Sequence, residues 1–218
     1  GLPASLALPP HLGDVEHLEG NRELLGYWLQ EAGKWRRSEG IRRAKSALEQ
    51  SGIAFTEEDL CSCVAEGRAR AVKLFVDAGM PGDVRNRQGV PALCLAVRGL
   101  HRTLVAPLLA AGGEIDAVSG DRGNTALMDA AAAGSLEITA DLIQAGAELD
   151  IRSKNGQTAL ILAVGQGSVD IAVRLIEAGA DPLASDSLGM SAYAYAKLFK
   201  QQKILDLIDR RGTKEEGV

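Results

Sequence analysis

Two glycine-led landmarks recur along this 218-residue chain at a period near 33 residues. The first opens four similar fragments, and its glycines, 34, 33 and 33 residues apart, are Gly89, Gly123, Gly156 and Gly189. The second is an Ala-Gly pair with the same period, at 78–79, 111–112, 145–146 and 178–179. Two landmarks in step predict an array of repeats in which each unit buries its apolar face only against its neighbours. Function must then be sought on the surface of the array.

One unit can be read residue by residue as turn, short helix, turn, longer helix and extended return. Thr158 is placed to cap a helix over 159–166, since a threonine hydroxyl accepts a bond from a free N–H group of the first turn. A second helix over 169–178 should end at Gly179, because glycine readily takes the left-handed conformation of a helix C-cap. The pattern therefore predicts about two helices per period.

This pattern resembles the ankyrin repeat. The family motif, Gly-x-Thr-Pro-Leu-His-x-Ala-Ala and later Leu-Leu-x-x-Gly-Ala-Asp, is similar to segments 125–131, 142–148 and 175–181. The resemblance covers about residues 53–212 and implies an all-α solenoid of helix-turn-helix-hairpin units. The motif histidine is replaced throughout, by Cys94, Met128, Ile161 and Ala194. The bond that this imidazole usually makes to a neighbouring loop is therefore expected to be absent.

The repeat period divides the chain into three parts. Residues 1–52 are expected to form an extended arm and a helical segment with a second helix over 41–50. That segment either caps the open N-terminal end of the stack or is a separate interaction element. Residues 53–212 are expected to hold about five repeats, starting near 53, 86, 120, 153 and 186. Residues 213–218 are expected to be a flexible tail.

Two local departures from the period carry structural predictions. The single spacing of 34 places one extra residue in the hairpin at 114–122, which should be longer at its tip. The last repeat turns polar outside, with Lys200, Lys203 and Asp206 among its surface residues. A polar outer face is what a terminal capping repeat needs.

The chain offers no assembled chemical site. Phosphate-binding, serine-nucleophile and zinc motifs are all missing from the sequence, so we expect no enzyme, no cofactor and no metal. The spacing of His11, Asp14 and His17 matches no common metal site, and His101 is expected to be exposed to solvent. Three cysteines, an odd number, argue against a disulfide framework.

The three cysteines are better explained by packing, and the net charge limits the partners. Cys61, Cys63 and Cys94 fall in repeat positions that call for small buried side chains, which is the usual place of a free cysteine. Free thiols favour the cytoplasm, and we expect a monomer. The formal net charge of −5 argues against nucleic-acid binding.

The family resemblance implies that partners dock on the concave side, along the hairpin tips and the first helix of each repeat. The residues expected there are Arg85, Arg87, Gln88, Val90, Arg98, Asp121, Arg122, Asn124, Arg152, Lys154, Asn155, Gln157, Gln166 and Met190. Six of them are cations and one is an anion, although the chain is acidic overall. We therefore expect a protein partner that presents an acidic segment, which arginine can grip in bidentate fashion.

A second basic stretch, Lys34–Lys45, surrounds Trp35. Basic residues around a tryptophan are found on membrane-surface helices and at nucleic-acid contacts. The alternative hypothesis is thus a membrane-proximal or regulatory module in which the N-terminal helices contact lipid or another domain. It is not favoured, because the stretch is short, Gly40 interrupts it and its apolar side is needed for packing.

Overall fold

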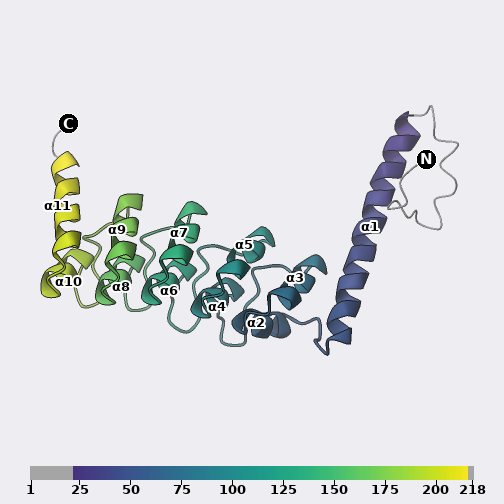
Figure 1. Cartoon of the computed structure of the whole chain (residues 1–218), viewed down its shortest axis with the longest axis horizontal. Coiled ribbons are helices and arrows are strands. Elements are labelled where there is room, and N and C mark those ends of the chain that lie inside the picture. The colour runs from purple at the N-terminus through teal and green to yellow at the C-terminus, as the bar shows by residue number, and fades with distance from the viewer. Residues whose placement is uncertain (1–21, 216–218) are drawn as a thin grey trace.

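The computed structural model describes residues 22–215, which form a row of stacked α-helices (Figure 1). The helices are α1 (Arg22–Gln50), α2 (Glu57–Ala65), α3 (Ala69–Asp77), α4 (Ala92–Arg98), α5 (Arg102–Ala110), α6 (Ala126–Ala132), α7 (Leu136–Gln144), α8 (Ala159–Gly165), α9 (Val169–Ala178), α10 (Ala192–Leu198) and α11 (Gln202–Glu215). The all-α solenoid is confirmed. The predicted arm, with His11 and His17, lies outside the described residues.

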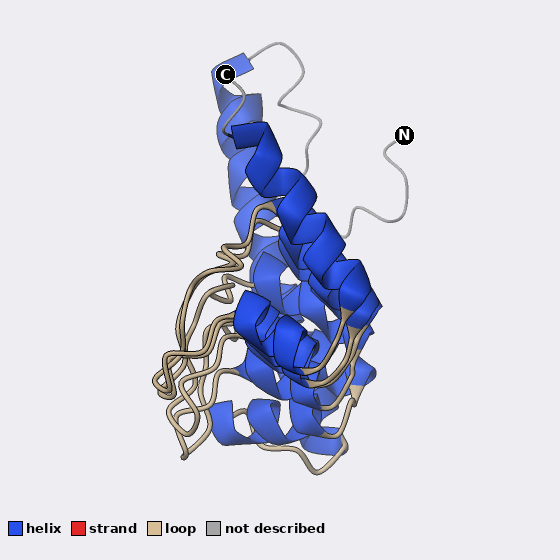
Figure 2. Ribbon diagram, turned by 90° about the vertical axis from the view of Figure 1, so that its left-hand side faces the viewer, coloured by secondary structure: helices blue, strands red, loops and turns tan. Residues whose placement is uncertain are grey.

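From α2 onward the helices form five pairs, each with a shorter or equal inner helix and an outer helix. The inner helices α2, α4, α6, α8 and α10 stack in one layer and the outer helices in a second (Figure 1). The loops that join one pair to the next all project to the same side of the helices (Figure 2). We call these loops fingers, numbered one to four from the N-terminus, with tips at 86–90, 119–124, 153–157 and 186–190.

The capping residues read from the sequence act as predicted. The Thr158 hydroxyl accepts a bond from the Ile161 N–H at 3.3 Å and begins α8. Thr125 caps α6 in the same way. The Gly179 backbone, at φ 115°, ends α9 in the left-handed region. These local choices fix where each helix starts and stops, and therefore which residues face the next repeat.

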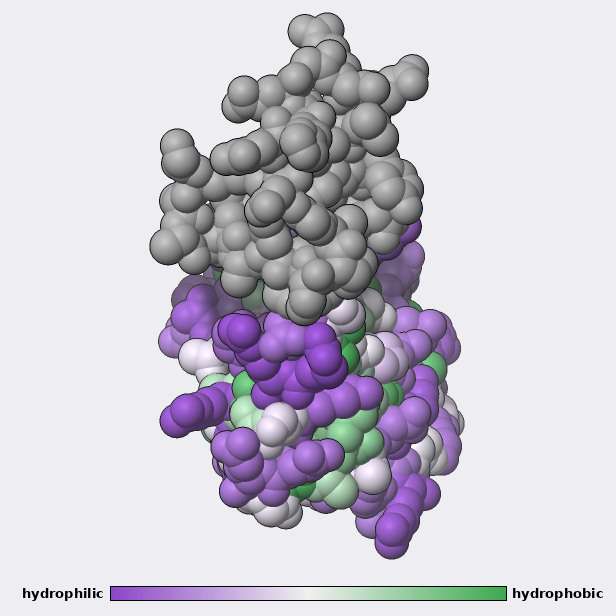
Figure 3. Space-filling model, turned by 90° about the vertical axis from the view of Figure 1, so that its right-hand side faces the viewer, coloured by the Kyte–Doolittle hydropathy of each residue, from purple (hydrophilic) through white to green (hydrophobic). Residues whose placement is uncertain are grey.

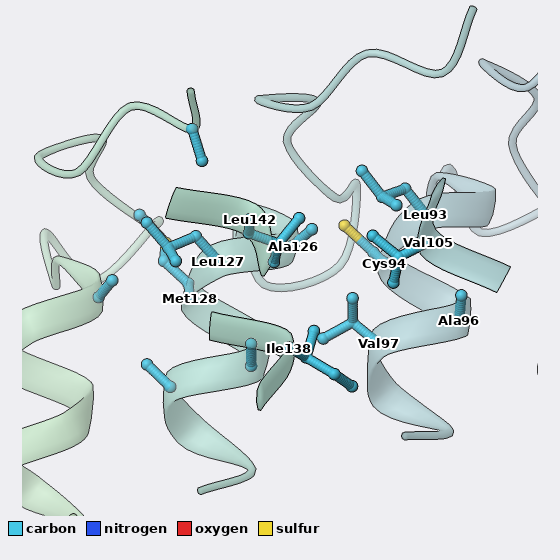
Figure 4. Close-up of a cluster of buried hydrophobic side chains, with 14 of the residues drawn as sticks. Leu93, Cys94, Ala96, Val97, Val105, Ala126, Leu127, Met128, Ile138 and Leu142 are labelled. Atoms are coloured by element: carbon cyan, nitrogen blue, oxygen red, sulfur yellow. The ribbon is translucent and has the colours of Figure 1, made fainter. Parts of the chain in front are cut away.

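Small apolar side chains fill the space between repeats. Val97 of α4 lies beside Ile138 of α7 (Figure 4), and Leu93 of α4 and Leu127 of α6 belong to the same continuous cluster of buried side chains. Alanines at equivalent positions of the inner helices are fully buried, including Ala96, Ala130, Ala163 and Ala196. Because alanine lets helices approach closely, each inner helix lies directly against the next, and the array is tightly packed.

The three cysteines belong to this core, as predicted. Cys61, Cys63 and Cys94 are each no more than 2% exposed. Burial raises the pKa of the Cys61 thiol to about 11 and that of Cys94 to about 12, so both stay protonated and unreactive at neutral pH. Cys94 occupies the motif's histidine position, and its sulfur lies 3.8 Å from the Ala117 carbonyl oxygen. A weak thiol contact thus stands where the imidazole bond is missing.

The N-terminal helical segment is one continuous helix and not two. The prediction of a separate helix over 41–50 was wrong: α1 runs through Gly40 without a break. Its C-terminal half packs antiparallel against α3, with Ala44 and Leu48 buried. A single glycine in a helix costs only about 1 kcal/mol, which packing readily offsets.

The C-terminal pair closes the other end of the array. Its α11 buries Ile204 and Ile208 and extends through residue 215, so the flexible tail predicted for 213–218 was wrong for residues 213–215. On the outward side, the Lys197 ammonium lies 4.3 Å from the centre of the Tyr193 ring. No helix within residues 22–215 combines the length and the apolar character needed to span a membrane.

Candidate protein-binding surface

Each finger tip is closed by one polar side chain at the same position of the repeat. Asn86, Ser153 and Asp186 each accept bonds from the backbone N–H groups two and four residues further along. In the second finger Ser119 accepts from the N–H five residues on, at 3.1 Å. The extra residue predicted for this hairpin is confirmed, and it lies between Ser119 and Asn124. These closed turns hold the tip residues in fixed positions.

Neighbouring fingers are joined to one another by backbone hydrogen bonds. The Gly120 N–H donates to the Gly89 carbonyl oxygen at 2.9 Å, and the Lys154 N–H donates to that of Arg122 at 3.1 Å. The Ser187 N–H donates to the Asn155 carbonyl oxygen at 3.0 Å. The four fingers therefore form one connected ribbon along the side of the array (Figure 2).

Three of the predicted surface cations strengthen these joints. Arg85 donates from Nη1 to the Val118 carbonyl oxygen at 2.7 Å, and Arg152 donates to that of Ser185 at 2.9 Å. The Lys154 ammonium donates to the Asp121 carbonyl oxygen at 3.0 Å. Each bond spans 33 residues, one repeat. A carbonyl does not neutralise a cation, so these side chains keep their charge but lose part of their freedom to reach a partner.

Arg98 was expected to be a free surface cation and is instead the centre of a half-buried network. Its Nε lies 2.7 Å from an Asp129 carboxylate oxygen and its Nη1 2.7 Å from one of Asp121. The Asn124 amide donates to the other Asp129 oxygen at 2.7 Å. The Arg98 bond, helped by Ser119, holds the pKa of the Asp121 carboxyl below its ordinary value.

This network corrects the charge count made from the sequence. Asp129 lies in a helix of the next repeat and was not counted, yet it is a second anion beside Arg98. Breaking such a buried pair by removing one partner costs about 3–5 kcal/mol. Arg98 therefore stabilises the long second finger and is not available to grip an acidic segment.

Two further predicted contact residues are inaccessible. Val90 is 1% exposed and Asn124 is 8% exposed, so neither side chain can reach a partner. Others remain open to a partner. The exposed residues of this set are Arg85, Arg87, Gln88, Asp121, Arg122, Arg152, Lys154, Asn155 and Gln166, and the half-buried ones are Gln157 and Met190. Of the exposed cations, Arg85, Arg152 and Lys154 are bonded to a neighbouring finger, so Arg87 and Arg122 are the ones whose side chains can reach a partner most freely.

The last repeat adds exposed apolar residues, two of which, Leu198 and Phe199, the sequence reasoning missed. Leu188 at the fourth finger tip is 82% exposed, and Leu198 and Phe199 at the end of α10 are 63% and 48% exposed. Phe199 stacks on Tyr195, whose hydroxyl donates to Asp186 at 2.9 Å. The repeat period could have revealed these two residues, because Leu198 and Phe199 occupy positions that hold Gly165 and Gln166 one repeat earlier.

His101 is a structural residue and not the exposed one that was predicted. Its Nε2 lies 3.0 Å from the Ala65 carbonyl oxygen of the preceding repeat. A Cβ at Gly67 would lie 2.4 Å from the ring, so the imidazole packs against the Gly67 backbone in space that any side chain would occupy. Among the described residues there is no group of His, Cys, Asp or Glu side chains arranged to hold a metal ion.

Comparison with known proteins agrees with this architecture. A family model described as ankyrin repeats (3 copies) matches residues 60–153 and again 127–214. The chain belongs to the ankyrin repeat family. The expected fold and family are therefore confirmed. Ankyrin repeats are in general protein–protein interaction modules.

Two curated relatives share this similarity. One is a protein of Treponema pallidum (strain Nichols) named as ankyrin repeat-containing, which is 38% identical over 167 residues, 77% of this chain and 56% of the relative. The other is the E3 ubiquitin-protein ligase KEG of Arabidopsis thaliana, 33% identical over 102 residues, 42% of this chain but 6% of that protein. The chain thus spans about half the length of the first relative.

Proposed function

We propose that this chain is a non-catalytic module that binds a partner protein along the finger surface, with a preference for an acidic segment. The supporting observation is the connected finger ribbon, in which backbone and side-chain bonds fix the tips one to another. A surface that is already ordered loses little conformational entropy when a partner binds.

The charge of this surface supports the preference for acid. Arg87 has a side chain 87% exposed and lies 3.8 Å from Glu58, a distance at which the ion pair is weak. Arg122 is exposed at the tip of the long finger. Arg85, Arg152 and Lys154 add positive charge around these two. An acidic segment laid across the fingers would meet all five.

The experiment is capture of a partner on the full chain, identification of that partner, and measurement of its affinity after purification. Arg87→Glu with Arg122→Glu should weaken binding at least about tenfold. The matched control is Arg42→Glu with Arg174→Glu, which changes the net charge equally at exposed positions away from the fingers. Equal binding by both variants would contradict the proposal.

A further inference from the structure

A groove runs between α1 and α3, at the end of the array and away from the fingers. It has a volume of about 680 Å³. Its apolar floor comes from Ile41, Ala44 and Ala47 of α1 and from Leu74 of α3, and Arg37 and Arg43 stand at its rim. Seen from this end of the molecule, the described surface is mostly hydrophilic and has hydrophobic residues exposed among the hydrophilic ones (Figure 3).

The charge around this groove is opposite to that of the whole chain. Residues 34–50 and 66–77 carry nine Lys and Arg side chains against four Asp and Glu, whereas the chain as a whole is acidic. Most of those four anions are already engaged. Glu39 binds Arg43 at 3.1 Å, and Asp77 at the groove's edge binds Lys73 at 2.9 Å. Within the described residues, Arg37 pairs with no acidic side chain.

We propose that this groove is a docking site for an acidic amphipathic helix of a partner protein. A groove between two helices accepts a helix whose apolar side enters it. Ile41 and Leu74 would contact that side, and Arg37 and Arg43 would meet carboxylates on its flanks. The charge of the site selects an acidic occupant over the other protein surfaces it encounters.

Two other occupants fit the groove less well. A membrane-surface helix inserts bulky exposed apolar side chains, and among the described side chains of α1, α2 and α3 no large hydrophobic one is exposed. Of the described apolar side chains of α1, Ala44 and Leu48 are buried and Ile41 and Ala47 line the groove. A second copy that docked through this same surface would set positive charge against positive charge and be repelled.

The glycines of α1 allow a test that leaves the fold intact. Gly40 lines the groove and Gly33 does not, yet a Cβ at either position would meet no atom within 4 Å. The backbone at Gly40 thus has room for a Cβ, and Gly40→Phe would place a ring in the groove while improving helix propensity. Gly33→Phe makes the same chemical change on the same helix outside the groove, and is the matched control.

The measurement is the fluorescence anisotropy of a labelled peptide in which leucines recur at helical spacing among glutamates, titrated with the full chain. We expect Gly40→Phe, and separately Arg37→Glu with Arg43→Glu, to weaken binding at least about tenfold. Gly33→Phe, and Arg174→Glu with Lys200→Glu at exposed positions far from the groove, should stay within about twofold. Circular dichroism verifies that each variant is folded.

Several outcomes would overturn the proposal. One is that the wild-type chain does not bind the peptide. Another is that the Gly40→Phe variant and the Arg37→Glu, Arg43→Glu variant both bind the peptide as tightly as the wild-type chain. The chain could also bind phosphatidylserine vesicles and not the peptide, which would assign the groove to membrane binding. Finally, self-association of the full chain that depends on Arg37 and Arg43 would assign the groove to a second copy of the chain.

Discussion

The two ends of the array are closed by different physical means. At the N-terminal end a further helix, α1, covers the outer helix α3 and buries Leu48 completely. At the C-terminal end α11 is the last helix of the described residues, and the side chains themselves change. Lys197 and Asp209 occupy positions that hold the buried Val164 and Ile176 one repeat earlier. One end is covered by an additional helix, and the other presents polar side chains where the preceding repeat has apolar ones.

Individual positions show the same contrast. Asp116 and Asp150 each accept a bond from a backbone N–H of the following repeat, at 3.0 Å. The equivalent residue of the last described repeat is Leu183, which is 65% exposed and, within residues 22–215, has no further repeat beside it. A residue that joins repeats is thus unnecessary where the array ends. The residue type at this position of a repeat thus depends on whether another repeat packs on its C-terminal side.

The largest expected effect comes from removing the packing at the N-terminal end. Leu48→Ala leaves a cavity where a fully buried leucine stood, and should lower the free energy of unfolding by about 2–5 kcal/mol. Urea denaturation measures this loss. Hydrogen exchange should show α1 and α3 losing protection before α9 does. A loss below about 1 kcal/mol, with α1 still protected, would show that α1 does not hold this end.

The next effect concerns one backbone position compared at both ends. The turn between helices holds Gly67 in the first repeat and Lys200 in the last, both with positive φ. Gly67→Ala adds the left-handed strain and pushes a Cβ into His101, so we expect about 2–3 kcal/mol of destabilisation. Lys200→Gly removes that strain and should stabilise by about 0.5–1 kcal/mol. Thermal unfolding of both variants in parallel gives the signs, and equal signs would refute the comparison.

A third change converts the C-terminal end into an interior one. Lys197→Val with Asp209→Ile restores the apolar residues of the preceding repeat, and stability should change by less than about 1 kcal/mol. The exposed apolar end should instead cause self-association that increases with protein concentration, seen by sedimentation velocity. The control, Arg42→Val with Glu177→Ile, makes a matched change at exposed positions elsewhere. A variant that remains monomeric would mean that these two polar residues do not close the array.

The smallest effect compares the first and fourth fingers as the pH is lowered. Burial raises the pKa of the Asp186 carboxyl, but bonds from the Met190 N–H, the Tyr195 hydroxyl and the Leu188 N–H outweigh it, and the pKa lies below its ordinary value. Its contribution to stability is therefore complete above the unfolded pKa, about 3.9, and is lost as the pH falls through the folded value.

Asn86 fills the same position in the first finger and makes the same two backbone bonds with an amide. Asp186→Asn should therefore change stability at pH 7 by no more than about 1 kcal/mol. It should also reduce the loss of stability below pH 4, measured by urea denaturation at several pH values. An unchanged acid dependence would show that this carboxylate is not the group responsible.

The sequence predicted the fold well because the repeat period assigns each residue a position. Thr158, Gly179 and Cys94 needed no more than that position and local propensity. The surface was harder, because side-chain partners come from the neighbouring repeat. Arg98 was misjudged since Asp129 is 31 residues away, and Val90 since its burial follows from how the folded chain packs around it. The period does not record those side-chain contacts.

The single backbone bond between successive fingers also has a mechanical consequence. The bonds at Gly120, Lys154 and Ser187 lie one after another along the array, so a force that pulls its ends apart passes through every joint in turn. At each joint the load is shared with the side-chain bonds of Arg85, Arg152 and Lys154 and with the packed helices. Because elements coupled only to their neighbours yield individually, such an array extends in steps of one repeat.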